Sequence, residues 1–128
     1  MNRMAVLVLV SMLSTPVIAD SFDGSRRVVC TTEQLRDCIA GTECLSGLPA
    51  EYGAPTSLRL DFANRQILGE RRKSKIRDLE KSKDQLLLQG RELGYGWTMA
   101  IDRQKGDMSL SLVNREGAFV LFGHCASL

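Results

Sequence analysis

Residues 97–112 read WTMAIDRQKGDMSLSL, and this stretch decides the fold class. Apolar residues stand at every second position on both sides of a polar turn at 104–107: Trp97, Met99, Ile101, Met108, Leu110 and Leu112. Strict alternation is the pattern of a β-strand that buries one face and exposes the other. The stretch therefore predicts two antiparallel strands joined by a tight turn.

The same alternation continues outward in both directions. It appears at 57–62, in shorter form at 66–70 and 85–89, and again in the apolar run 118–123. Turn residues separate these segments at regular intervals, which is typical of an antiparallel all-β fold. We expect a mostly β protein whose residues 57–128 form an antiparallel meander or a small barrel-like sheet.

The preceding segment, residues 20–56, has a different character. It holds several glycines and prolines and three of the four cysteines, so we expect an irregular segment tied by disulfides within a single domain, 20–128. A short strand is expected at 27–30. Thr31–Glu33 is expected to start one helical turn with Thr32 as its N-cap.

The first 19 residues resemble a secretory signal. Arg3 is followed by the apolar run Met4–Leu13 and by the short residues before Ala19. This order predicts cleavage after Ala19 and a periplasmic or secreted protein with no stable membrane insertion. The alternative, a transmembrane anchor, needs roughly 20 apolar residues, about twice this run. A lipid anchor needs a cysteine at the cleavage point, but the first is Cys30.

The four cysteines are Cys30, Cys38, Cys44 and Cys125. An even number in a short exported chain predicts disulfides, for which three connectivities exist, whereas the spacings do not match a zinc knuckle. A closing meander brings its first and last strands together. We therefore hypothesise the pairs Cys30–Cys125 and Cys38–Cys44, the second clipping a local loop.

Residues 70–83 hold seven cations and three acids. We expect a solvent-facing hairpin arm with its tip at Lys83–Asp84; the alternative is a helix, because Ile76 and Leu79 are three residues apart. Its basic residues are candidates for binding an acidic partner, either a protein or an envelope component. The alternative role is a charged edge that prevents aggregation. The candidate residues are Arg71, Arg72, Lys73, Lys75 and Arg77.

Aromatic residues near glycines provide another candidate. Tyr95 and Trp97 alternate with Gly94 and Gly96, and glycine lets a backbone approach closely. Trp97 continues the apolar alternation, so we expect it to fill the core. Tyr95 remains a candidate partner-binding residue.

Catalysis is not expected. The chain has one histidine, His124, and strand alternation sends it to the face opposite Cys125. The carboxylates Glu51, Asp61, Asp102 and Asp107 share no motif, and no metal or cofactor signature is present. With 17 basic and 15 acidic residues, the net charge of +2 gives no reason to expect nucleic acid binding.

Two resemblances add expectations. The segments 97–102, 106–112 and 119–125, with the start at Cys30, resemble small exported periplasmic proteins of Gram-negative bacteria, a likeness that implies no activity. The chain is also similar, more weakly, to periplasmic inhibitors of C-type lysozyme, which are disulfide-pinned antiparallel barrels with a Ser-Gly-x-x-Tyr loop. Here Ser46-Gly47 is followed by Tyr52, so the spacing departs from that motif and no site residues are transferred.

Together these features predict a small secreted periplasmic protein that acts by binding a protein or an envelope component, without catalysis. The alternatives are a lysozyme-inhibitor-like protein and a passive structural protein of the envelope.

Overall fold

The structure is a computed structural model of the whole chain, and it describes residues 13–14 and 22–128. Apart from residues 13–14, the predicted signal and its cleavage point after Ala19 lie outside the described residues. In the described part of the chain, no helix has the length and apolar character needed to cross a membrane.

The described residues are mostly β, as predicted. They form a short 3-10 helix, η1 (Pro49–Tyr52), and ten strands. The strands are β1 (Val28–Cys38), β2 (Leu45–Gly47), β3 (Ser57–Asp61), β4 (Gln66–Leu68), β5 (Lys73–Lys75), β6 (Asp78–Lys81), β7 (Gln85–Glu92), β8 (Tyr95–Asp102), β9 (Asp107–Asn114) and β10 (Gly117–Ser127).

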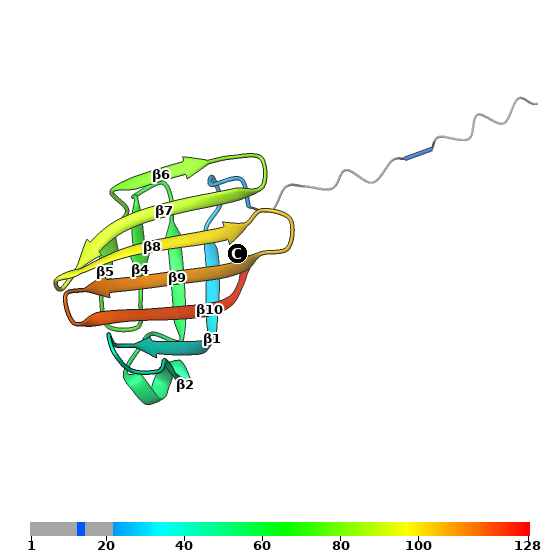
Figure 1. Cartoon of the computed structure of the whole chain (residues 1–128). Helices are drawn as coiled ribbons and strands as arrows, with labels where there is room; N and C mark the ends of the chain where they lie inside the picture. The colour runs from blue at the N-terminus through cyan, green and yellow to red at the C-terminus, as the bar shows by residue number, and fades with distance from the viewer. Residues whose placement is uncertain (1–12, 15–21) are drawn as a thin grey trace, which may run out of the picture.

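All strands belong to one antiparallel sheet with the order β5-β4-β3-β1-β10-β9-β8-β7-β6, and β2 pairs with β1 (Figure 1). Strands β3 to β5 and β6 to β10 follow one another as a meander. The long strand β1 lies between β3 and β10, so it joins the first and last strands of that meander. The predicted curled meander is confirmed.

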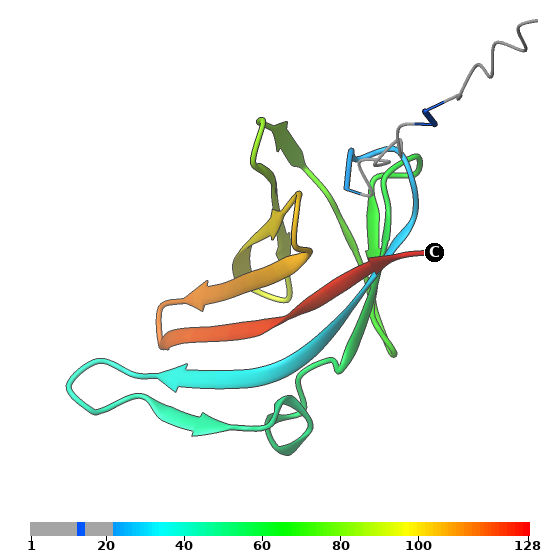
Figure 2. The ribbon, with the colours of Figure 1, turned by 90° about the vertical axis from the view of Figure 1, so that its right-hand side faces the viewer.

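The two edges of the sheet are linked directly through the chain. Strands β5 and β6 end the strand order on opposite sides, yet only Ile76 and Arg77 separate them. The Ile76 amide donates to the Arg65 carbonyl at 2.8 Å, and the Arg77 amide donates to the Gln89 carbonyl at 2.9 Å. The segment therefore crosses from one edge to the other, and the sheet curls into a half-barrel (Figure 2).

The core fills the concave side of this curl. Trp97 is buried, as predicted, and its Nε1 donates to Ser74 Oγ at 2.9 Å. Its ring lies against Gly90, where a Cβ atom would be 2.4 Å from the ring. The largest side chains with almost no exposed surface are Leu35, Leu60, Ile76, Leu86, Leu88, Met99, Ile101 and Leu121.

Both hypothesised disulfides are present. Cys30 pairs with Cys125, which stands directly opposite it in the β1–β10 register, and both residues are buried. Cys38 pairs with Cys44 and closes the loop between β1 and β2. The first bridge therefore links β1 to β10, the last strand of the meander, and the second fixes the β1–β2 hairpin.

The helical turn expected at Thr31–Glu33 is wrong, because β1 continues through these residues. It pairs with β10 along one side and with β2 and β3 along the other, and this pairing satisfies the backbone better than one isolated helical turn. Thr32 lies at an irregularity in the register, where its Oγ1 donates to the Pro55 carbonyl at 2.6 Å.

Residues 70–83 form neither a helix nor a separate arm. Their hairpin tip is present, since the Ser82 amide donates to the Gln85 carbonyl at 3.0 Å and closes the β6–β7 turn. The rest of the segment belongs to the two sheet edges. Ile76 explains the difference: it is buried in the core, which draws the chain inward between β5 and β6.

Candidate binding surfaces

Three turns gather at one end of the curled sheet. They join β1 to β2 (residues 39–44), β7 to β8 (93–94) and β9 to β10 (115–116). The register places them side by side, because Ala118 pairs with both Cys38 and Val113, and Val113 also pairs with Gly96 of β8. Figure 2 shows the β1–β2 and β9–β10 turns on the same side of the molecule. We call residues 37–45, 93–95 and 112–119 the hairpin end.

Large apolar side chains are exposed at the hairpin end. The exposed fractions are 55% for Ile39, 60% for Leu45, 65% for Leu93 and 50% for Val113. Single exposed apolar residues are common on protein surfaces, but a group at one end of a sheet indicates a contact surface. These four residues were not predicted as a group from the sequence. The doublet Leu112-Val113 carries a signal, because Val113 stands where the alternation calls for a polar residue.

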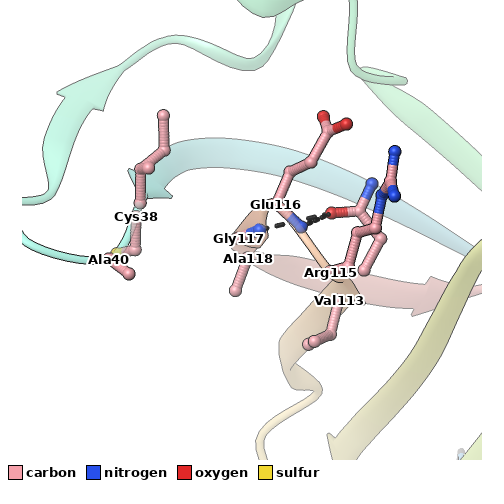
Figure 3. A pocket seen from close by; sticks show the side chains of 9 residues that line it. Cys38, Ala40, Val113, Arg115, Glu116, Gly117 and Ala118 are labelled. Carbon is pink, nitrogen blue, oxygen red and sulfur yellow. Dashed lines mark hydrogen bonds between the residues drawn. The ribbon is translucent and has the colours of Figure 1, made fainter.

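A shallow hollow of about 370 Å³ lies on the outer side of this end. Figure 3 shows Cys38 and Ala40 on one side of it and the β9–β10 turn on the other. Asn114 Oδ1 fixes that turn by accepting hydrogen bonds from the amides of Glu116 (2.9 Å) and Gly117 (3.2 Å). The exposed Arg115 and Glu116 carry opposite charges at the rim.

Tyr95 belongs to the hairpin end on its concave side. Its side chain is half-buried, and the ring centroid lies 6.3 Å from that of Phe119 in a tilted arrangement. The structure therefore places this candidate at the same end of the sheet but on the face opposite the hollow. The basic candidates belong to another set of strands.

The basic candidates lie along β5 and its flanks. Arg71 and Arg72 occupy the β4–β5 turn, Lys73 and Lys75 are on β5, and Arg77 lies in the link to β6. All five are exposed. Among residues 13–14 and 22–128, no carboxylate forms an ion pair with any of the five. Their charge is therefore directed to solvent.

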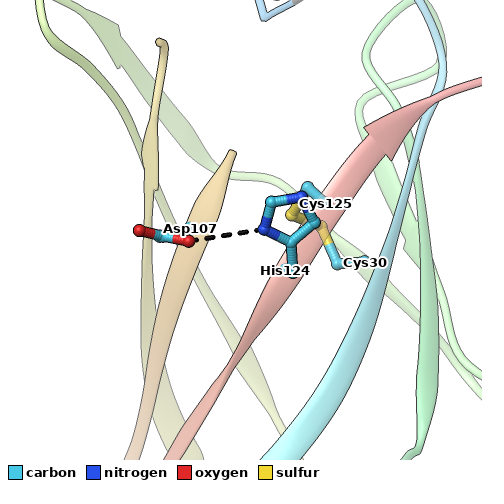
Figure 4. The surroundings of a disulfide bond; sticks show 4 residues. All are labelled: Cys30, Asp107, His124 and Cys125. Atoms are coloured by element: carbon cyan, nitrogen blue, oxygen red, sulfur yellow. Dashed lines mark hydrogen bonds and ion pairs between the residues drawn. A yellow bond between two sulfur atoms is a disulfide. The ribbon is translucent and has the colours of Figure 1, made fainter. Parts of the chain in front are cut away.

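His124 faces outward, opposite the buried Cys125, as strand alternation predicts (Figure 4). Its Nδ1 lies 3.3 Å from Asp107 Oδ1, and the two side chains are 53% and 69% exposed. Neither residue lines the hollow at the hairpin end. Within the described residues, no three His, Cys, Asp or Glu side chains are grouped to hold a metal ion.

Two of the candidate carboxylates stabilise turns. Asp61 accepts hydrogen bonds from the side chain and amide of Asn64, and these bonds hold the pKa of Asp61 below its ordinary value. The amides of Lys105 and Gln104 donate to Asp102 at 2.8 Å each and lower the pKa of Asp102. Both groups therefore stabilise the local backbone in their ionised forms.

Comparison with known proteins gives no relative: no protein-family model, curated protein or solved structure matches the chain.

Proposed function

We propose that this is an exported protein that acts by binding another protein through the hairpin end, without catalysis. The exposed Ile39 and Val113, which line the hollow of about 370 Å³, are the observation that carries the proposal. The apolar run Met4–Leu13 and the two disulfides support export to the periplasm or beyond.

The hairpin end is held in one shape before any partner arrives. The Cys38–Cys44 bridge closes the β1–β2 loop, and Asn114 fixes the β9–β10 turn. A preformed surface loses little conformational entropy on binding, so more of the contact energy appears as affinity. This supports a specific protein contact over a surface that is apolar only by chance.

The chemistry of the hairpin end suits a protein partner. Ile39 and Val113 supply apolar contact area at the hollow, while Arg115 and Glu116 place one charge of each sign at its rim. An apolar centre with a polar rim is the usual composition of protein–protein interfaces. A partner with a small apolar side chain beside a charged pair would be complementary to it.

A single charge at the hollow of this surface is expected to weaken binding strongly. We expect Val113→Glu to reduce capture of the partner from envelope extract at least tenfold, because an unpaired carboxylate buried in the contact costs more than the ~1.4 kcal/mol that corresponds to a tenfold change. Val113 is half exposed, so the change should leave the fold intact. Quantitative pull-down with the immobilised protein measures the effect.

Ser109→Glu is the matched control for this experiment. Ser109 is exposed on the same strand and the same face, four residues or about 13 Å from Val113. The Ser109→Glu variant should capture the same protein as the wild type, in the same amount. Equal capture by all three proteins would reject the hairpin end as the binding surface. If the wild type captures nothing, a passive structural role in the envelope is favoured instead.

One observation favours a second candidate function, inhibition of lysozyme. Ser46 and Gly47 are adjacent on the β2 edge, and a Cβ atom on Gly47 would lie 2.4 Å from the Tyr52 ring. The fold thus brings together a serine, a glycine and a partly exposed tyrosine despite their unusual spacing in the sequence. The resemblance to lysozyme inhibitors associates these three residue types with a loop that enters the enzyme cleft.

This candidate predicts a measurable loss of lysozyme activity. Adding the protein to a C-type lysozyme should slow cell-wall lysis, and Tyr52→Ala should weaken the inhibition at least tenfold, because the tyrosine ring is the largest exposed contact of the three. Tyr52→Phe, which retains the ring, is the control. Undiminished lysis with excess wild-type protein would exclude the inhibitor function.

A further inference from the structure

A second surface, independent of the hairpin end, lies on the outer face of β3, β4 and β5. Register pairs Arg59 with Leu68, and Leu68 with Lys73, so these side chains point to the same face. Lys75 is two residues along β5 and also points outward. Arg59 and Lys73 are separated by two strand spacings, about 10 Å.

The two lysines line a hollow of about 340 Å³. Asn64, Gln66 and Ser74 are the other residues that line it, so none of its five residues carries a negative charge. Side-chain amides and ammonium groups both donate hydrogen bonds. Asn64 Nδ2 already donates to Asp61 and the Ser74 hydroxyl to the Arg91 carbonyl, so the hollow presents the Gln66 amide together with the two ammonium groups, a combination suited to an oxyanion.

The nearest acid in the β4–β5 turn is engaged elsewhere. Glu70 Oε1 accepts hydrogen bonds from the Thr56 amide (3.0 Å), the Thr56 hydroxyl and the Ser57 amide (3.1 Å). These bonds lower the pKa of Glu70 and fix its carboxylate toward the start of β3. Asp61 lies on the same face, in register with Gln66 and Lys75. Its carboxylate, however, is paired with Arg27 at 3.3 Å and accepts a hydrogen bond from Asn64. Among the described residues, the cations of β5 therefore form no ion pair with either acid.

Protection of a sheet edge does not account for this arrangement. The opposite edge, β6, carries both signs, with Asp78 and Glu80 beside Lys81. Edge protection needs charge on the edge strand. Arg59, however, lies on β3, which pairs with a neighbour on each side. A cation on an interior strand, aligned with those of β5, points to a ligand.

We propose that Arg59, Lys73 and Lys75 form a binding face for closely spaced phosphate groups. The cations are about 7 to 12 Å apart at the backbone, so a single phosphate meets only part of the face. A ligand with several neighbouring phosphates engages all three. Arg71, Arg72 and Arg77 surround the face and extend its positive field.

The test compares two sources of such phosphates with single phosphate ions. The folded, disulfide-bonded protein is titrated with inorganic phosphate, with tripolyphosphate, and with phosphatidylcholine vesicles that contain or lack phosphatidylglycerol. We expect tight binding to tripolyphosphate or to the phosphatidylglycerol vesicles, a much weaker response to inorganic phosphate, and affinity that falls steeply with added salt. Binding to vesicles alone assigns the lipid headgroup as the source, and binding to tripolyphosphate alone assigns a soluble ligand.

Charge neutralisation distinguishes this face from the overall charge of the protein. The triple variant Arg59→Gln, Lys73→Gln, Lys75→Gln should bind roughly a hundredfold more weakly, given the contribution of each cation at an anionic surface. Arg26→Gln, Lys83→Gln, Lys105→Gln is the matched control; all three of its positions are exposed and it removes the same charge. Equal losses in both variants, or no binding to either multivalent ligand, would overturn the proposal. Val113→Glu tests the hairpin end separately.

Discussion

Replacing Cys30 and Cys125 together by alanine is expected to lower the free energy of unfolding by about 4–5 kcal/mol. The reason is the size of the loop that the bridge closes. The cysteines are 95 residues apart, so the bridge greatly reduces the conformational entropy of the unfolded state. Denaturant unfolding of wild type and variant, followed by far-UV circular dichroism, measures the difference. In a domain of this size such a loss removes a large part of the total stability.

The second bridge supplies the control. Cys38 and Cys44 are 6 residues apart, and the same chain-entropy argument gives about 2 kcal/mol for Cys38→Ala with Cys44→Ala. The residues between them are exposed, so little packing is lost. The opposite order of the two losses would show that the β1–β10 junction does not depend on its bridge.

Trp97→Ala is expected to cost about 3–5 kcal/mol of stability. The ring fills the space left by Gly90 and is hydrogen-bonded to Ser74, so its loss opens a cavity and unties β8 from β5. Because Trp97 is the sole tryptophan of the chain, unfolding is followed by circular dichroism rather than by indole fluorescence.

Trp97→Phe separates packing from the hydrogen bond. It retains an aromatic ring beside Gly90 but loses the donor to Ser74, so we expect a smaller cost of about 1–2 kcal/mol. A Trp97→Ala variant as stable as Trp97→Phe would mean that the ring does not fill the core in the way the structure indicates.

The meander was predictable because alternation is a local signal. In the stretch 97–112, Trp97, Met99 and Ile101 are all buried, as their spacing predicts. The disulfide pairing was also predictable, since a meander that closes must bring its two ends together. Here a topological argument was enough to select one of three connectivities.

The long first strand was not predictable by the same means. The alternation of β1 is interrupted near Thr32, where the register with β10 shifts, and its pairing partners lie far away in the sequence. The hairpin arm predicted for residues 70–83 was wrong for a related reason. The burial of Ile76 depends on the opposite edge of the sheet, so its local basic surroundings indicated only an exposed segment.

The candidate surfaces were also only partly predictable, because local sequence indicates single residues and strand pairing decides which of them lie together. The charges of Lys73 and Lys75 were evident from composition, but their alignment with Arg59 depends on strand pairing. The hairpin end depends on three turns from separate parts of the chain. Only Tyr95 was selected there from the sequence, through its neighbouring glycines, and Ile39, Leu93 and Val113 were not.

We propose that this chain is exported and that its two sulfur bridges, Cys30–Cys125 and Cys38–Cys44, then hold the sheet closed. Intact mass spectrometry of the protein isolated from the cells that produce it, with alkylation before and after reduction, tests this claim directly. We predict a chain that begins at Asp20 and takes up alkylating reagent only after reduction, at four cysteines. A native chain that begins at Met1 and is alkylated at all four positions without reduction would contradict it.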